Sequence, residues 1–230
     1  MRSALARLTL ARLTIIASPL VLAACAGAVP ERRADAPPST GRPTASRPVI
    51  TAPSADTQAC FGELNRAGFR FTPLPDQQFG GGCQAVGSLR LNDIGTGTTN
   101  LGPMTCGLAR NFAAWVRHAV RPAAQQVFGQ DAVRVETFGT YSCRNIYGGR
   151  SGRLSEHARA NAVDVSAFVL ADGRRITVLQ GWNGDARDQQ FLRLIRGSAC
   201  RRFGTVLSPD YNAAHANHFH FDMSGQNYCR

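Results

Sequence analysis

Histidine and acidic side chains that could hold a metal ion gather in two short segments of the chain. The first contains His157 and Asp164, and the second contains His215, His218 and His220. In an extended chain, alternation places His218 and His220 on one face and the intervening phenylalanines on the other. Catalytic zinc sites use three protein ligands, which two histidines and one carboxylate satisfy. The sequence therefore predicts a metal site built from two rigid segments.

Strands and helices must position these side chains. Apolar residues recur at helical spacing over 106–120 and 186–197, and Pro122 is expected to bend or end the first helix. Alternating patterns predict strands at 133–138, 162–170, 174–179 and 218–222. An Asp172-Gly173 turn joins the second of these strands to the third as a hairpin. The predicted fold class is α+β, with a small antiparallel sheet that carries the metal site and is flanked by helices.

The first 25 residues read as a secretory signal. Arginines precede an apolar run, 13–24, which is shorter than the about 20 residues of a membrane-spanning helix. The run ends at Cys25 in a Leu-Ala-Ala-Cys sequence that resembles the bacterial lipoprotein signal, in which the cysteine is lipidated. Ala26, by the same resemblance, favours the outer membrane. The alternative is an ordinary signal peptide cut after Ala24 or nearby.

Residues 26–57 form a predicted linker. They hold six of the twelve prolines and show no apolar periodicity, which indicates a disordered, partly polyproline tether. Residues 58–230 form the predicted domain. A chain of this length can bury enough surface for a single hydrophobic core to stabilise it.

Cysteine usage indicates an oxidising compartment. Apart from Cys25, the chain has an even set of six cysteines, which predicts disulfides: Cys60, Cys83, Cys106, Cys143, Cys200 and Cys229. Six cysteines allow 15 pairings. Loop economy favours Cys60–Cys83, Cys106–Cys143 and Cys200–Cys229. A metal–thiolate site is disfavoured, because the chain has no Cys-x-x-Cys pair.

The formal net charge is +11, and every basic residue other than histidine is arginine. The absence of lysine excludes Schiff-base and phosphate-loop lysine chemistry. The chain has no long arginine cluster and no interleaved aromatic motif, so nucleic acid is not an expected partner. A basic exported protein suits anionic cell wall or lipid head groups, although solubility alone would also explain the charge. A serine hydrolase is disfavoured, since no Gly-x-Ser-x-Gly elbow occurs.

Two motifs carry a family resemblance. The segment from Ser155 to Asp164 resembles Ser-x-His-x-x-Gly-x-Ala-x-Asp of the zinc D-Ala-D-Ala metallopeptidases, a group that includes lysostaphin-type endopeptidases and the hedgehog domain. The later segment resembles the closing His-x-His of that group. Residues 58–230 resemble the bacterial extensin-like C-terminal family. The residues that carry this second resemblance are Thr105-Cys106, Gly-Thr-Tyr-Ser-Cys-Arg at 139–144, SEHARANAVDV, Ala199-Cys200 and HFHFD.

The resemblance implies a hedgehog- or DD-peptidase-like fold and assigns the site residues. His157, Asp164 and His220 are the expected ligands of one zinc ion. His218 is expected to face the substrate and the activated water, taking a proton and later passing one to the leaving amine. His215 is a looser candidate for a second active-site histidine. The same two-histidine, one-carboxylate set would also suit non-haem iron, so a different metalloenzyme stays open.

Four further positions define the expected reaction. Arg144 resembles the arginine that polarises the scissile carbonyl, with a structural ion pair as its alternative role, and Ser155 is expected at the substrate rim. Ala160 replaces the family glycine, and Asn217 replaces the glutamate base of the dipeptidase branch. Any base must then be a histidine.

The expected protein is a monomeric lipoprotein, anchored to the membrane at Cys25 and facing the periplasm. Its expected function is that of a zinc D,D-carboxypeptidase or endopeptidase that hydrolyses peptide bonds of peptidoglycan stem peptides or crosslinks. The alternative is a non-catalytic peptidoglycan-binding or structural envelope lipoprotein that retains the fold.

Overall fold

The computed structural model describes residues 52–149 and 151–230. The predicted signal segment, Cys25 and most of the predicted linker lie outside these residues. Helix α1 (Ala55–Arg66) begins within the last residues of that linker, because Ser54 caps it by accepting a hydrogen bond from the backbone N–H of Thr57. The described helical structure thus starts slightly before the expected boundary at residue 58.

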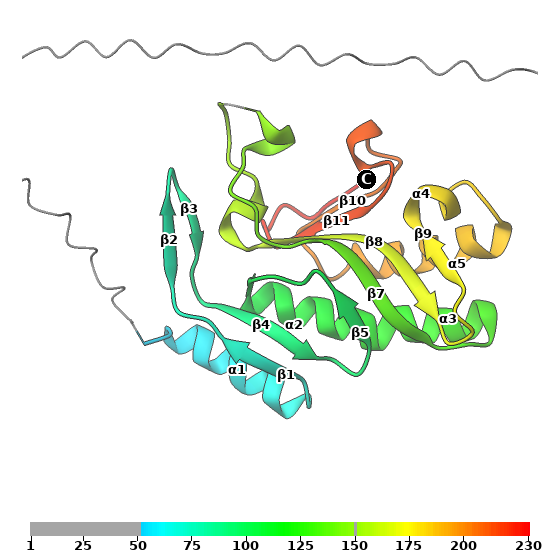
Figure 1. The fold of residues 1–230 in the computed structure, drawn as a ribbon, viewed down its shortest axis with the longest axis horizontal. Coiled ribbons are helices and arrows are strands. Elements are labelled where there is room, and N and C mark those ends of the chain that lie inside the picture. Colours follow the sequence, from blue (N-terminus) through cyan, green and yellow to red (C-terminus); the bar gives the residue numbers. More distant parts are fainter. Residues whose placement is uncertain (1–51, 150) are drawn as a thin grey trace, which may run out of the picture. The chain divides into compact units, whose positions relative to one another are not determined.

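Seven strands of the described residues form the main sheet, in the order β12-β10-β11-β8-β7-β5 with β9 paired to β8 (Figure 1). Their bounds are β5 (Gly97–Thr99), β7 (Ala132–Gly139), β8 (Ala162–Leu170), β9 (Arg175–Thr177), β10 (Thr205–Leu207), β11 (Phe219–Asp222) and β12 (Tyr228–Cys229). The expected antiparallel pairing is confirmed for β7, β8, β9, β10 and β11. At the edges, β5 and β12 pair parallel to their neighbours. Parallel pairing of β5 with β7 needs a long crossover, which the intervening helices provide.

Helices cover one face of this sheet (Figure 1). They are α2 (Cys106–Trp115), α3 (Arg121–Phe128) and α5 (Ala186–Ala199), with the short α4 (Val178–Gly181) beside β9. Trp115 is fully buried and its ring packs edge-on against Phe168 of β8 and Phe221 of β11. Its indole N–H donates to the backbone carbonyl of Ile195. The aromatic core therefore lies between the helices and this face.

Pro122 does not end the first helix, contrary to one of the two expected outcomes. A π-helical turn, Val116–Val120, joins α2 to α3, and the N–H of Arg121 bonds to the carbonyl of Val116, five residues back. Proline lacks an N–H, and in an α-helix its ring clashes with the carbonyl four residues back. The wider turn just before Pro122 relieves that conflict, so the helix continues to Phe128.

The chain segment before α2 forms two smaller sheets. Strands β1 (Arg70–Pro73), β4 (Ser88–Asp93) and β6 (Met104–Thr105) form a small antiparallel sheet, and β2 (Gln77–Gly80) forms a hairpin with β3 (Cys83–Ala85). The side chains of Leu64, Leu89 and Met104 are fully buried here. Strands this short carry almost no periodicity, so the sequence predicts no elements in this region.

All six expected disulfide cysteines are paired, but two of the three expected pairings are wrong. The bonds join Cys60 to Cys106, Cys83 to Cys143 and Cys200 to Cys229. Only the last agrees with loop economy. The other two close longer loops, of 46 and 60 residues, because α1 packs on α2 and the β2–β3 hairpin meets the loop after β7. Tertiary packing decides these partners.

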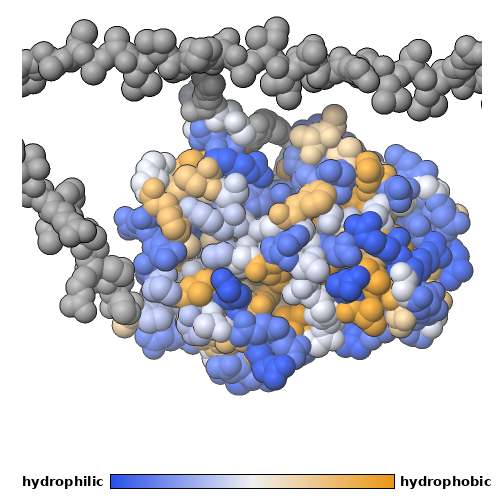
Figure 2. All heavy atoms as spheres, viewed as in Figure 1, coloured by the Kyte–Doolittle hydropathy of each residue, from blue (hydrophilic) through white to orange (hydrophobic). Residues whose placement is uncertain are grey.

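The surface is mixed in character. Hydrophilic and hydrophobic residues interleave on the face drawn in Figure 2. Among the described residues, no helix is long and apolar enough to cross a membrane.

Candidate metal centre

The register between β8 and β11 brings two of the three expected ligands together. Asp164 stands directly opposite His220, while Phe221 stands opposite Val163. Period two then turns the carboxylate and the imidazole to the face that the helices leave open, and it turns the apolar partners into the core. The faces expected from alternation in these two strands are confirmed.

His157 reaches the same place from a short 3₁₀ helix, Glu156–Arg159. Ser155 caps this helix, and its hydroxyl accepts a hydrogen bond from the N–H of His157 at 3.3 Å. The helix ends at Ala160, whose φ of 54° lies in the left-handed region. Glycine adopts that conformation without steric cost, which explains the glycine of the resembled motif; alanine tolerates it at a small energetic cost.

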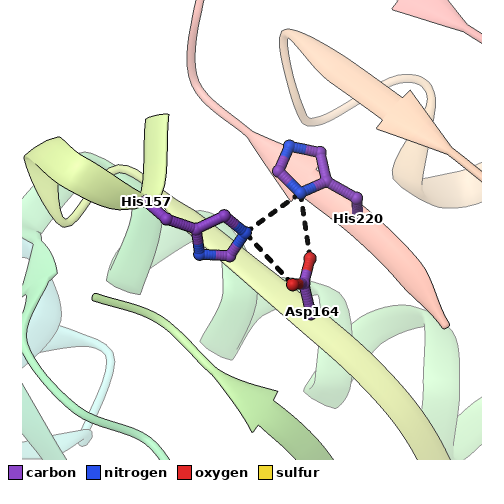
Figure 3. A group of neighbouring side chains, drawn as sticks. All are labelled: His157, Asp164 and His220. Carbon is purple, nitrogen blue, oxygen red and sulfur yellow. Dashed lines mark hydrogen bonds and ion pairs between the residues drawn. The ribbon is translucent and has the colours of Figure 1, made fainter. Parts of the chain in front are cut away.

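The three side chains form a tight triangle (Figure 3). His157 Nε2 lies 3.2 Å from both His220 Nδ1 and Asp164 Oδ2, and His220 Nδ1 lies 2.9 Å from Asp164 Oδ1. All three are buried, and their ligand atoms lie within 4.8 Å of one another. Two imidazole nitrogens and one carboxylate form a donor set that zinc binds readily. This geometry satisfies the ligand requirements of a metal ion.

In both imidazoles, the ring nitrogen that points away from the triangle forms a hydrogen bond. His157 Nδ1 donates to the backbone carbonyl of Thr140 at 2.7 Å, and His220 Nε2 donates to Asp222 Oδ2 at 3.0 Å. Metal-binding histidines characteristically use their second nitrogen in this way, which fixes the ring orientation and tautomer. Neither partner was predicted from the sequence. Asp222 could have been found, because it lies two residues after His220 and therefore on the same strand face.

The electrostatics of the triangle keep Asp164 ionised. Burial alone would raise the pKa of this carboxyl, but hydrogen bonds from His157 and His220 outweigh burial and hold it well below its usual range. Burial would likewise lower the pKa of His220, yet bonds to Asp164 and Asp222 raise it to about 9. His220 Nδ1 must therefore release a proton before it binds a metal ion.

His218 stands beside the triangle. Its Nδ1 donates to the side-chain oxygen of Asn217 at 2.8 Å, and its Nε2 lies 3.6 Å from Asp164 Oδ1. In the neutral ring, donation from Nδ1 leaves Nε2 without a proton. Burial is the main cause that lowers the pKa of His218. Neutral at physiological pH, this ring presents a proton acceptor next to the ligands. Asn217 thus orients the His218 ring beside the triangle.

His215 and Arg144 complete the set. The His215 ring centroid lies 5.2 Å from that of His218, and its Nδ1 bonds to Asn212 Oδ1. Burial, followed by repulsion from His218, lowers the pKa of His215 to about 4. Arg144 Nη2 lies 3.9 Å from Asp164 Oδ2, too far for a hydrogen bond. Its guanidinium is partly exposed and faces the open space above the ligands.

This open space is a cavity of about 500 Å³. Its lining includes Asp164 and His220, a wall formed by residues 144, 146 and 153–156, and further residues from 211–218 and 224–228. Ser155 lines it but is buried, and its contact with the His157 N–H shows a structural role. Its expected position at the substrate rim stays a prediction. His118, the remaining histidine, is exposed on the π-helical turn and does not belong to the site.

The sequence of residues 58–230 matches the family described as Extensin-like protein C-terminus. The chain belongs to the extensin-like C-terminal family. No curated protein and no solved structure matches it. Membership covers the whole predicted domain, including both motif segments, the disulfide cysteines and the three candidate metal ligands. An extensin-like domain with three buried, converging ligands beside a cavity is therefore the basis for any functional proposal.

Proposed function

We propose that this extensin-like protein is a cell-envelope zinc peptidase that hydrolyses peptide bonds of peptidoglycan stem peptides or crosslinks. The observation that carries the proposal is the convergence of His157, Asp164 and His220 beneath a cavity that also contains a neutral, oriented His218. Hydrolytic zinc sites require three protein ligands, an accessible face and a group that moves protons.

The chain's own residues suit the steps of hydrolysis. Zinc, when bound, would supply a Lewis acid that activates water and polarises a carbonyl. His218 Nε2 accepts a proton from the attacking water and passes one to the leaving amine. Arg144, facing the same cavity, stabilises the negative charge that develops on the scissile carbonyl oxygen. His215 packs against His218 and keeps it desolvated.

The cellular setting is part of the proposal. A lipid anchor at Cys25 would hold the protein in the outer membrane, and residues 26–57 would tether the domain so that it reaches the cell wall in the periplasm. The three disulfides suit an exported protein. The proposed overall architecture is that of the hedgehog and DD-peptidase group, and the proposed active form is a monomer.

Metal content is the first test. Elemental analysis of the full chain should find about one zinc per molecule, and His157→Ala and Asp164→Ala should each lose it while remaining folded by circular dichroism. His118→Ala, an exposed histidine remote from the site, is the matched control and should keep the metal. Iron in place of zinc would redirect the search to a different metalloenzyme, and no bound metal after zinc is offered at neutral pH would reject the peptidase proposal.

Activity is the second test. Zinc-loaded protein incubated with purified sacculi should release new amino groups, and His218→Ala should lower that rate about 10²- to 10⁴-fold while retaining zinc. If zinc-loaded, folded protein releases no amines from any peptidoglycan type, the catalytic proposal fails.

A second candidate function is supported by Asn217, which replaces a glutamate base. In that case the protein binds peptidoglycan without cutting it and acts as a structural envelope lipoprotein. Sacculi should then retain the wild-type chain and His218→Ala equally in a sedimentation assay, with no amine release from either.

A further inference from the structure

The carboxylates that line the cavity are all engaged by neighbours of their own. Asp164 accepts from His220 Nδ1 at 2.9 Å, and its other oxygen lies 3.2 Å from His157 Nε2. Asp222 accepts from His220 and from the N–H of Ser224. Glu156 accepts from Arg159 at 3.3 Å and from Asn161 at 2.7 Å. No acidic side chain in the cavity lining of the described chain is left to neutralise a cation on its wall.

Arg153 is such a cation. It lines the cavity, is exposed, and forms no ion pair with any carboxylate of residues 52–149 and 151–230. Arg144, on the same wall, at least approaches Asp164 at 3.9 Å. An arginine at a cavity mouth with no internal partner is available to an anionic ligand.

The backbone that carries Arg153 is braced. Its carbonyl accepts from the N–H of Ile146 at 2.9 Å, and the next residue, Leu154, forms a β-bridge with Asn145. The Cys83–Cys143 disulfide ties the start of this segment to the β2–β3 hairpin. The wall is thus held in place beside the metal-binding triangle, as a specificity-determining side chain requires.

We propose that Arg153 recognises a carboxylate of the peptide substrate. This assignment rests on the proposed function, because it assumes that the ligand is a peptide. The planar guanidinium matches a carboxylate with two parallel N–H···O bonds. The carboxylate comes either from the C-terminus of the peptide or from an acidic side chain near the scissile bond, and both sources offer the same chemistry. The first source would make the enzyme a carboxypeptidase, and the second would permit cleavage within a crosslink.

The test measures binding to the metal-free full chain, so that neither hydrolysis nor direct coordination of a carboxylate by zinc contributes. Three short peptides ending in D-Ala-D-Ala serve as probes: the free acid, its C-terminal amide, and the amide with a D-glutamate upstream. Calorimetry should show that one carboxylate-bearing peptide binds about tenfold more tightly than the uncharged amide, a preference that weakens with added salt. The favoured peptide identifies the source of the carboxylate.

Substitutions test whether Arg153 causes the preference for the carboxylate-bearing peptide. Arg153→Gln should abolish the roughly tenfold preference and leave amide binding unchanged, and Arg153→Lys should retain part of it. Arg90→Gln is the matched control, since Arg90 is exposed on β4 outside the cavity lining. An undiminished preference in Arg153→Gln, or no preference in the wild-type chain, overturns the proposal. Failure of the proposed peptidase function would show separately, as absent amine release from sacculi.

Discussion

The carboxylate behind His220 offers a sharp test of the candidate metal centre. Asp222 Oδ2 accepts the Nε2–H of His220 at 3.0 Å, which leaves Nδ1 directed at Asp164 and His157. In Asp222→Asn the side chain keeps its shape but loses its charge. We expect zinc affinity to fall about 10- to 100-fold, the usual cost of removing a partner that orients a metal ligand.

The magnitude agrees with the local structure. Asp222 is only 5% exposed, so solvent screens its bond to His220 very little. A hydrogen bond to a charged group contributes about 1.5–3 kcal/mol. Since 1.4 kcal/mol corresponds to a factor of ten, this predicts the same 10- to 100-fold loss. Asp222 also helps to raise the pKa of His220 to about 9, which reflects the same interaction.

The assay is competition for zinc between the protein and a chelating dye, at fixed pH. Asp56→Asn, an exposed carboxylate in the first turn of α1, is the matched control and should bind zinc like the wild type. Asp222→Glu, which keeps the charge, should retain more affinity than Asp222→Asn. If Asp222→Asn is folded and its affinity lies within twofold of the wild type, the reasoning about His220 is wrong.

Substitutions elsewhere test the tautomer of His218, one disulfide and the aromatic core. Asn217→Ala frees His218 Nδ1 and should lower the rate of amine release about tenfold, with zinc content unchanged; an unaltered rate would contradict the assigned tautomer. Replacing Cys83 and Cys143 together by serine should lower the free energy of unfolding by about 2–5 kcal/mol in denaturant titrations, and a loss below 1 kcal/mol would count against a stabilising bond. Trp115→Ala should cost about 3–5 kcal/mol by the same assay, because it empties the centre of the aromatic core; a smaller loss would mean that the core collapses around the gap.

The parts of the fold that were predicted correctly are those with long, regular patterns. Strands β7, β8 and β11 and helix α5 all lie at or near their expected positions. β8 differs in one respect: every residue in it is buried, so its two faces do not alternate between core and solvent. The reason is its central place in the sheet, where β7 pairs with one edge of β8 and β11 and β9 pair with the other.

The parts that were missed or wrong depend on distant contacts. Strands such as β5, β10 and β12 have two or three residues, too few for a periodic signal. The π-helical turn before Pro122 is recognisable only once the helix is seen to continue. Disulfide partners follow from which elements pack together, so counting residues between cysteines selected the wrong partners for Cys60 and Cys83.

The chemistry available to the site could be predicted from the order of residues alone. Residue types and alternation specified two imidazoles and a carboxylate, and they turned the phenylalanines of β11 toward the core. The folded chain was needed to show that Asp164 stands opposite His220, and that the Thr140 carbonyl orients His157. Strand register and backbone carbonyl positions depend on how distant segments pack. Every residue carries a carbonyl, so no side-chain pattern marks the one that a folded site will use.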